Sequence, residues 1–255
     1  MMTTNDLKGR VVLITGGRRV GSELALLLAE RQAKVVMTYH TSRHAIETTI
    51  AAIHDRGGEG LAVSADLTNA AQAARAVDQA SQAFGGLDSL VNMASVYRRT
   101  PFDSLQPGDF DDMIAANLAG PYHTAVAAAR IMVHGYREDA RQRTIVNIGD
   151  WASERPYKDY LPYLIAKGGL ATMTLALAKE LAPAVAVSMI QPAMIDPPPE
   201  FSDDDKRAVL DQTPLGRFGS AGDVNRLVLY LLEGTRFVTG SCFRVDGGRF
   251  LGVDS

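Results

Sequence analysis

The hydrophobic and polar positions along the chain fall into two alternating patterns. Short apolar runs such as VVLIT and TIVNI show no regular polar alternation, which is typical of strands buried on both faces of a parallel sheet. Longer Ala-rich stretches between these runs carry apolar residues at helical spacing. The predicted strands are Arg10–Thr15, Lys34–Tyr39, Gly60–Ser64, Ser89–Asn92, Thr144–Ile148, Val185–Ile190 and Cys242–Val245. The predicted helices are Gly21–Arg31, Arg43–Arg56, Ala70–Phe84, Gly108–Leu118, Tyr122–Tyr136, Tyr160–Ala182 and Gly222–Glu233.

Strands and helices alternate along the whole chain with short connections. This order is typical of an α/β fold in which a parallel sheet carries helices on both faces. No Ser/Gly-rich linker, repeat or low-complexity tract divides the 255 residues. We therefore predict a single domain, residues 1–255, built on a Rossmann-like, doubly wound, seven-stranded parallel sheet.

The segment Gln191–Leu215 matches neither pattern. Pro197 to Pro199 exclude a helix or a paired strand at their own positions. The mostly acidic run Ser202–Asp205 indicates a helix N-terminus, and we interpret it as a solvated cap. Long loops late in α/β enzymes often cover the active site, so residues of about 192–215 are expected to form a substrate loop.

Composition and charge narrow the functional classes. The chain is 46% hydrophobic and 22% charged, as globular proteins are, and its net charge of −3 gives no basic excess for nucleic-acid binding. The start, MMTTNDLKGR, has no apolar signal segment, and no uninterrupted 18-residue apolar run predicts a membrane helix. Cys242 is the only cysteine, which excludes an internal disulfide and agrees with a reducing cytoplasm. His40 and His44 have no third ligand nearby in sequence, so no metal site is expected.

The turn after the first strand is rich in glycine. Gly16, Gly17 and Gly21 precede the helix SELALLLAE, and such a strand–turn–helix unit places backbone N–H groups at a phosphate. The glycines do not match G-x-G-x-x-G, so a tight turn without a ligand is the alternative interpretation. Arg18 and Arg19 lie in the turn, and paired arginines at a helix N-terminus favour a bound anion over a solvent-exposed turn.

The second strand indicates which dinucleotide binds. It ends in Met37-Thr38-Tyr39-His40, without the acidic residue that would contact the ribose 2′-hydroxyl of NAD and repel a 2′-phosphate. Thr41, Ser42 and Arg43 follow, and hydroxyl and guanidinium donors suit a phosphate dianion. We therefore expect NADPH, with Asp66 and Asn92 at the same edge of the sheet.

A Tyr-x-x-x-Lys pair opens the helix at Tyr160–Ala182. Tyr163 and Lys167 lie one helical turn apart on one face, and an ammonium there is expected to lower the phenol pKa. A usable phenol acid contributes about 10²–10⁴ in rate. Asp150 lies at the carboxyl end of the preceding strand, where it can join the pair or act as a simple cap.

The sequence resembles the short-chain dehydrogenase/reductase family over nearly its full length. The matching features are Thr15 and Gly16, Asp66, Asn92–Ala94, Asn117, the VNI before Asp150, Tyr163, Lys167, Pro192 and Thr239–Gly248. The resemblance implies strand order 3-2-1-4-5-6-7, a nicotinamide cofactor and hydride transfer. It also implies a homotetramer or homodimer that packs through the helices of Gly108–Tyr136 and Tyr160–Ala182.

The sequence departs from the family pattern at two places, and in both it resembles one branch of the family, the pteridine and dihydromonapterin reductases. The glycine turn is one residue short, with Arg19 where a glycine usually falls, and Asp150 replaces the usual Ser. The DGGR ending at Arg249 is also similar. Tyr97, two residues after Ser95, falls where the branch stacks an aromatic ring on the pterin, although core packing is the alternative. Trp151 either shapes the pocket or packs in the core.

We therefore predict a cytoplasmic NADPH-dependent oxidoreductase that transfers hydride to a pterin C=N bond. The alternatives are a carbonyl or 3-oxoacyl thioester reductase of the same family and a non-catalytic NADP(H)-binding sensor. The partners expected are a small-molecule substrate and further copies of the chain, not nucleic acid or a membrane. The predicted catalytic residues are Asp150, Tyr163, Lys167 and Asn117, the last bridging Lys167 to solvent through water. The predicted substrate-binding residues are Arg19, Ser95, Tyr97, Asp150 and Tyr163. The predicted cofactor-binding residues are Gly16, Arg18, Arg19, Gly21, His40, Thr41, Ser42, Asp66, Leu67, Asn92, Ala94, Tyr163, Lys167 and Pro192.

Overall fold

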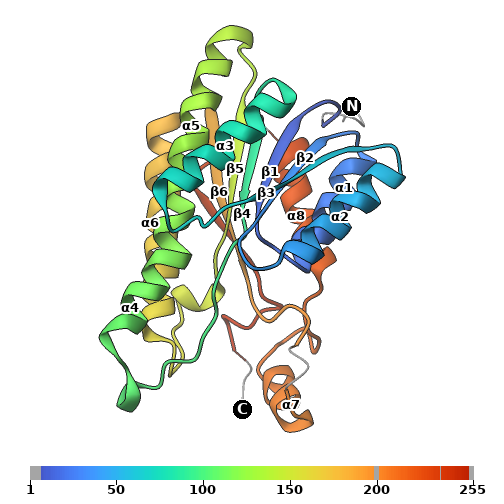
Figure 1. Ribbon diagram of the computed structural model, residues 1–255. Helices are drawn as coiled ribbons and strands as arrows, with labels where there is room; N and C mark the ends of the chain where they lie inside the picture. The colour runs from blue at the N-terminus through green and yellow to red at the C-terminus, as the bar shows by residue number, and fades with distance from the viewer. Residues whose placement is uncertain (1–6, 198–200, 236, 253–255) are drawn as a thin grey trace.

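A seven-stranded parallel sheet forms the centre of the molecule (Figure 1). The structure is a computed structural model and describes residues 7–197, 201–235 and 237–252. The strand order is β3-β2-β1-β4-β5-β6-β7, and each neighbouring pair is parallel. The predicted fold class and strand order are therefore confirmed. The strands are β1 Val11–Thr15, β2 Lys34–Tyr39, β3 Glu59–Ser64, β4 Ser89–Asn92, β5 Arg143–Ile148, β6 Val185–Pro192 and β7 Ser241–Val245.

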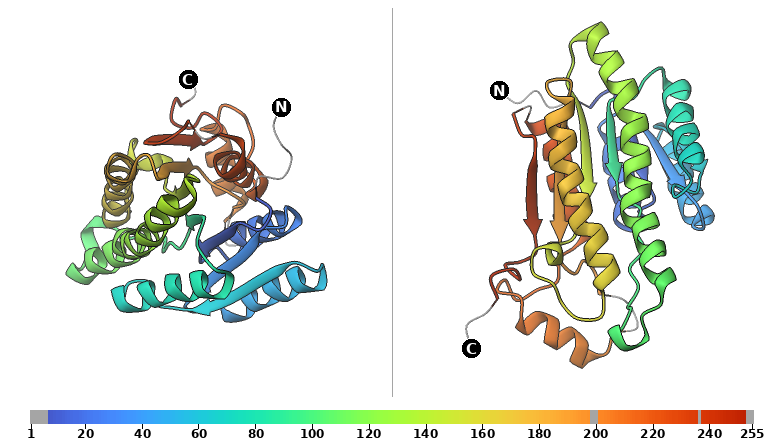
Figure 2. Two further views of the ribbon diagram at one scale, coloured as in Figure 1. Left: turned by 90° about the horizontal axis from the view of Figure 1, so that it is seen from above. Right: turned by 90° about the vertical axis from the view of Figure 1, so that its left-hand side faces the viewer.

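Helices cover both faces of the sheet, as Figure 2 shows from two directions. One face carries α1 and α2 with α8, and the other carries α3, α5 and α6. The short helix α4 packs against α6, and α7 lies beyond the carboxyl edge of the strands. The helices are α1 Val20–Glu30, α2 Arg43–Asp55, α3 Ala70–Phe84, α4 Pro107–Ile114, α5 Gly120–Asp139, α6 Leu161–Leu181, α7 Asp203–Asp211 and α8 Ala221–Leu229.

The strand β1 explains why the apolar runs lack alternation. Val12 and Ile14 pack into the core under α1 and α2, whereas Val11 and Leu13 pack into the core under α3 and α5. Successive side chains of a strand point to opposite faces, so a strand with a core on each side needs apolar residues at every position. Each of these side chains contributes about 1.5–3 kcal/mol by leaving water.

One predicted boundary is wrong, because α4 and α5 are a single rod. A π-helical turn, Ala115–Ala119, joins them where the sequence analysis ends one helix and begins another. Pro121 lacks the N–H that would bond to the carbonyl of Asn117 in a regular helix. The wider π turn absorbs this missing bond, so the chain continues without a break, and it leaves Asn117 fully buried at the joint.

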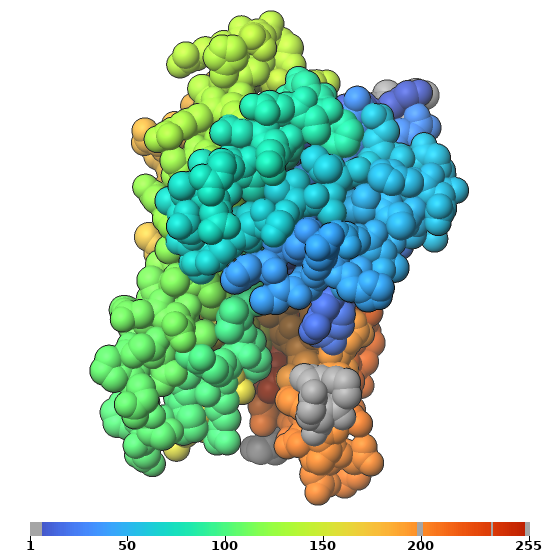
Figure 3. Space-filling model, viewed as in Figure 1, coloured from blue at the N-terminus to red at the C-terminus, as the bar shows by residue number. Residues whose placement is uncertain are grey.

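The segment after β6 crosses the carboxyl edge of the sheet and contains α7. Ser202 caps this helix, with its hydroxyl accepting a hydrogen bond from the Asp205 N–H, so the predicted cap is confirmed. The surface is hollowed between α7 and the α4 side of the molecule (Figure 3). Pro198 and Pro199 lie outside the described residues, as does the predicted absence of a leader at 1–6.

Helix α6 is long and apolar enough to span a membrane by length and composition alone. In the structure it packs along β6 and against α4, and it contributes Leu170, Thr174 and Ala178 to the protein interior. Such a helix is the ordinary core helix of a globular α/β fold.

Candidate active site

A cavity of about 530 Å³ lies at the carboxyl edge of the sheet, at the point where the strand order reverses. Two backbone features shape its floor. Gly16 and Gly17 have φ angles of +60° and +80°, a region that L side chains rarely adopt. A Cβ on Gly17 would lie 2.9 Å from the Cα of Gly21, so the turn stays close to α1 only because this position is glycine. The lining includes Gly16, Gly17, Arg18, Arg19, His40, Thr41, Ser42, Asp66, Leu67, Ala94, Ser95, Val96 and Ala116.

Two hydrogen-bond donors of this cavity have no side-chain partner among the described residues. Arg18 and Ser42 both line it, and the Ser42 hydroxyl makes no capping bond although the residue begins α2. No acidic residue stands at the end of β2. Arg19 instead donates to the backbone oxygen of Asp196, 3.1 Å away, and so ties the glycine turn to the segment after β6. The Asp66 carboxylate accepts from Thr68, which lowers its pKa and keeps it ionised.

Five predicted cofactor residues do not line this cavity: Tyr163 and Lys167, described below, and Asn92, Gly21 and Pro192. Asn92 is buried, and its amide group bonds to Asn147 and Pro121 while its oxygen accepts from Thr124. Gly21 lies in the first turn of α1, where its Cα packs against Gly17, and Pro192 is the last residue of β6. These positions hold the sheet edge together rather than the cavity surface.

Three of the four predicted catalytic side chains come from the turn after β5 and from α6, and they meet beside the cavity. The Tyr163 hydroxyl donates to Oδ2 of Asp150 at 2.8 Å, and Oδ1 accepts from the Ala152 N–H at 2.8 Å. The Lys167 ammonium donates to the backbone oxygen of Ile148 at 3.0 Å. Its Nζ lies 5.7 Å from the centre of the Tyr163 ring. Asp150 is thus more than a turn cap, because it also bonds to the phenol.

Burial controls the pKa values of this group. Loss of solvent raises the pKa of Asp150, despite the hydrogen bonds it accepts from Ala152 and Tyr163. Burial, followed by the neighbouring Asp150 charge, raises the pKa of Tyr163 well above its ordinary value. Burial lowers the pKa of Lys167 to about 8. The predicted lowering of the phenol pKa by Lys167 is therefore wrong for this structure, in which Tyr163 is a protonated donor at neutral pH.

Asn117 holds the segment after β4 rather than Lys167. Its Oδ1 accepts from the Ser95 hydroxyl at 2.6 Å and from the Val96 N–H at 3.1 Å. Its Nδ2 donates to the oxygens of Val96 and Met113. Because the amide is fully engaged, Asn117 fixes the path of Ser95 and Val96, and a water-mediated link to Lys167 stays a prediction.

An aromatic wall of Tyr97, Tyr157 and Tyr160 faces Tyr163. Tyr97 stacks on Tyr160 with ring centres 4.5 Å apart and lies edge-on to Tyr163 at 5.1 Å. The Tyr157 hydroxyl donates to that of Tyr97 at 3.2 Å. Tyr97 is therefore more than buried packing, since half of it is exposed beside the phenol. Tyr157 and Tyr160 are absent from the predicted site, and only their clustering in YKDYLPY, which ends at Tyr163, could have pointed to them.

Trp151 and Arg249 close the far side of the site. Trp151 is buried with Met113 and Tyr163, which agrees with packing, and the Arg249 guanidinium lies over its ring at 5.3 Å. A second cavity of about 350 Å³, under α7, is lined by Arg249 together with Arg217 and Arg244. The sequence analysis notes Arg249 only within the DGGR ending.

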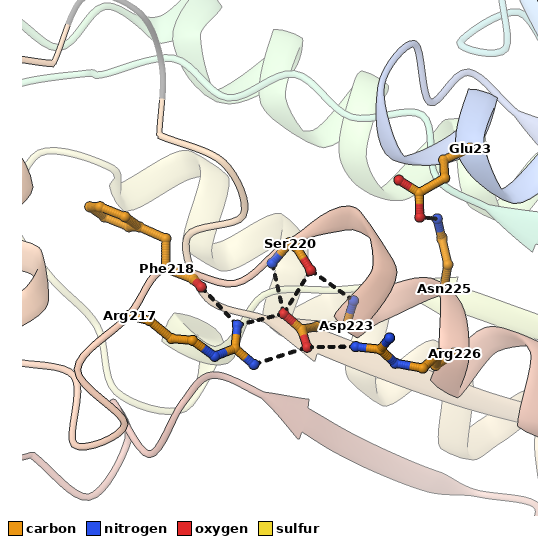
Figure 4. Close-up of polar contacts among 7 residues, drawn as sticks. All are labelled: Glu23, Arg217, Phe218, Ser220, Asp223, Asn225 and Arg226. Carbon is orange, nitrogen blue, oxygen red and sulfur yellow. Dashed lines mark hydrogen bonds and ion pairs between the residues drawn. The ribbon is translucent and has the colours of Figure 1, made fainter.

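The end of the loop that carries α7 is anchored at the start of α8, as Figure 4 shows. Asp223 accepts from the Arg217 guanidinium at 2.7 and 3.0 Å and from the backbone N–H of Ser220. These bonds lower the pKa of Asp223, so the carboxylate is ionised. Asn225 donates to Glu23 at 3.3 Å and joins α8 to α1. The segment after β6 is thus fixed at its C-terminal end.

Comparisons with known proteins agree with this geometry. A family model described as "Enoyl-(Acyl carrier protein) reductase" matches residues 17–249. A Streptomyces violaceoruber protein named as a ketoacyl reductase of a granaticin polyketide synthase is 34% identical, covering 98% of this chain and all of that protein. The (2S)-[(R)-hydroxy(phenyl)methyl]succinyl-CoA dehydrogenase subunit BbsD of Thauera aromatica is 33% identical, over 96% and 98% of the two chains. A short-chain dehydrogenase from Burkholderia cenocepacia, solved with NADP, superposes with a TM-score of 0.88 at 30% identity, over 96% and 99% of the chains.

Proposed function

The chain belongs to the short-chain dehydrogenase/reductase family, and on this premise we propose that it is an NADPH-dependent reductase of a carbonyl carbon, with a ketone or 3-oxoacyl thioester as substrate. The observation that carries the proposal is the protonated Tyr163 hydroxyl, held by Asp150 beside the dinucleotide cavity. Reduction needs an acid that keeps its proton until charge develops on the substrate oxygen. The names of both relatives describe a keto or hydroxy acyl group, which supports the carbonyl over other acceptors.

The residues divide the work of this reaction. The cofactor, when bound, supplies a hydride to the carbonyl carbon. Tyr163 gives its proton to the carbonyl oxygen as negative charge develops there. The phenolate left behind then recovers a proton either from Asp150 in its protonated form, which its raised pKa favours, or from the Lys167 ammonium, whose Nζ lies 5.7 Å from the ring centre. The aromatic wall of Tyr97, Tyr157 and Tyr160 covers this side of the site and limits the entry of water.

The proposed preference for NADPH depends on the free donors at the end of β2. Arg18 and the uncommitted hydroxyl of Ser42 can meet a 2′-phosphate, and no acidic residue there would repel it. Charge-assisted hydrogen bonds of this kind contribute about 1.5–3 kcal/mol each.

A pterin C=N bond is a second candidate substrate, favoured by one observation. Asp150, a carboxyl group, is the partner of the phenol, and its raised pKa would let it protonate a ring nitrogen. Tyr97 offers an exposed ring beside it for stacking.

The test is NADPH oxidation with an acetoacetyl thioester, simple diketones, dihydrobiopterin, dihydromonapterin and dihydrofolate. We expect the carbonyl compounds to be turned over faster than the pterins, and Asp150→Ser to keep measurable carbonyl reduction because a hydroxyl can still bond to the substrate oxygen. Turnover of the pterins alone would replace the carbonyl with the pterin assignment. Binding of NADPH without turnover of any compound would favour a non-catalytic sensor.

We also propose that the chain forms a homodimer or homotetramer in the cytoplasm. Tyr122 on α5 and Leu161, Ile165 and Leu175 on α6 are exposed apolar side chains on the helices expected to pack between copies. Light scattering of the purified protein would measure the number of subunits.

A further inference from the structure

Arg249 is a partly buried cation that forms no ion pair with any described residue. Among the described residues its guanidinium forms no hydrogen bond and no ion pair, and its Nε is inaccessible to water. Burial lowers the pKa of Arg249, which shows that the surroundings disfavour its charge. A cation in such a position is costly unless an anion arrives to pair with it.

The other arginines of the same cavity have carboxylate partners. Arg217 is paired with Asp223, and Arg244 is paired with Glu154 and stacks on Phe250. These two pairs have the fork geometry or close approach that satisfies a guanidinium. Among the described residues, Arg249 is therefore the one arginine of this cavity without a carboxylate partner.

Two carboxylates of the same region, Asp246 and Asp150, are already engaged in other bonds. Asp246 accepts from the N–H groups of Gly248 and Phe250 and so shapes the turn that carries Arg249. Asp150 accepts from Ala152 and Tyr163. Each is committed to a positioning role, and neither bonds to the guanidinium.

The turn that presents Arg249 is rigidly built. Arg155 donates to the backbone oxygens of Arg249 and Phe250 at 3.2 and 2.6 Å. The Gly247 oxygen accepts from the Leu215 N–H at 3.0 Å, which ties the turn to the loop after α7. The guanidinium is thus held over Trp151, on the side of the site that faces Asp150 and the second cavity. A guanidinium fixed on this side of the site can orient a ligand before the reaction.

We propose that Arg249 binds a carboxylate of the substrate, so that the site acts on oxo compounds that carry an acid group near the reacting carbonyl. This inference rests on the proposed carbonyl reduction. A carboxylate matches the planar fork of the guanidinium with two parallel hydrogen bonds. It enters from the cavity under α7, while the carbonyl lies against Tyr163.

The first experiment compares acetoacetate with methyl acetoacetate, which differ only in the acid group. We expect the wild type to have the lower KM for the acid, and Arg249→Met to raise the KM of the acid at least about tenfold while changing that of the ester less than about threefold. Arg249→Lys should restore part of the difference, because it keeps the charge and loses the fork. Arg244→Met is the matched control, since it removes a charge from the same cavity and should leave the ratio of acid to ester unchanged.

The second experiment does not depend on turnover. Trp151 is the only tryptophan of the chain, and Arg249 lies over its ring, so its fluorescence should change when a carboxylate binds. We expect succinate to give a saturable change in the wild type and none in Arg249→Met at the same concentrations. Saturable binding with no carbonyl turnover would leave Arg249 as an acid-binding residue and reject the proposed function alone.

Three outcomes would overturn the inference and leave the function intact. They are equal KM values for acid and ester, an acid preference that survives in a folded Arg249→Met protein, and a fluorescence response to inorganic phosphate but not to succinate. Far-UV circular dichroism of each variant checks that it is folded.

Discussion

Replacement of Tyr163 by Phe removes one oxygen atom and tests both the chemistry and the electrostatics of the site. The variant keeps the ring, which packs against Tyr97 and Met113, and loses the donor to Asp150. A positioned general acid contributes about 10²–10⁴ in rate, which is about 3–5 kcal/mol at 1.36 kcal/mol for each factor of ten. We expect kcat to fall by that factor, while the Kd for NADPH changes less than about threefold.

The same substitution has a predictable effect on stability. Oδ2 of Asp150 loses its hydroxyl donor in a partly buried place, which costs about 1–3 kcal/mol, or about 2–10 °C in Tm for a chain of this size. Burial already raises the pKa of Asp150 above its ordinary value of 3.8, and loss of the Tyr163 bond raises it further. A raised carboxyl pKa stabilises the fold below the unfolded pKa, and this stability is lost as the pH rises through the folded pKa. The difference in Tm between wild type and variant should therefore grow from pH 5 to pH 8.

The assays are NADPH oxidation under saturating substrate and thermal unfolding at the two pH values. Tyr136→Phe, near the C-terminal end of α5, is the control for loss of a phenol oxygen elsewhere. A variant that retains more than about a tenth of wild-type kcat would refute the role of Tyr163 as the acid. A Tm difference that is equal at pH 5 and pH 8 would refute the coupling to Asp150.

Three further predictions concern the charged side chains Lys167 and Arg18. Burial lowers the pKa of Lys167 to about 8, so the ammonium is lost as the pH rises through that value and kcat/KM for reduction should decline above it; a profile that is flat to pH 10 would contradict this. Burial of Lys167 costs no stability above the unfolded pKa of 10.5, where the amine is neutral in both states, and destabilises the fold as the pH falls through about 8. Lys167→Met removes this cost, so the inactive variant should have a higher Tm than the wild type at pH 6 and not at pH 10. Arg18→Ala should lower the ratio of kcat/KM for NADPH to that for NADH by about tenfold; a wild type that uses both cofactors equally would already oppose the assignment.

The parts of the molecule that could be predicted from sequence depend on short-range pattern. The strand VVLIT is apolar throughout because both of its faces meet a core, and that requirement is visible in the residues themselves. Tyr163 and Lys167 share a helix face by their spacing alone. Asp150 could be placed beside them because a strand end and the following helix meet at one edge of the sheet.

The parts that could not be predicted depend on burial and on loops that meet across the fold. Neighbouring positions suggested that Lys167 lowers the phenol pKa, but desolvation is larger, and only the packed structure shows it. Arg249 reaches Trp151 from the far end of the chain, and Tyr97 joins Tyr160 from the loop after β4. No short-range pattern in the sequence predicts contacts between segments that lie so far apart along the chain. The π turn at Asn117 also escapes pattern analysis, because Pro121 ordinarily marks a helix boundary.

The clamp that Asn117 places on the segment after β4 has a kinetic consequence. Ser95 and Val96 line the dinucleotide cavity, and the next residue, Tyr97, belongs to the wall of the substrate site. Asn117 bonds to Ser95 through its amide oxygen and to Val96 through both its oxygen and its nitrogen. Residues 95–97 therefore form a rigid segment that borders the dinucleotide cavity at one end and the substrate site at the other. A dinucleotide bound in this cavity would lie beside Val96, one residue before the Tyr97 ring. For the proposed reduction we therefore expect the cofactor to bind before the substrate and the reduced product to leave before the oxidised dinucleotide.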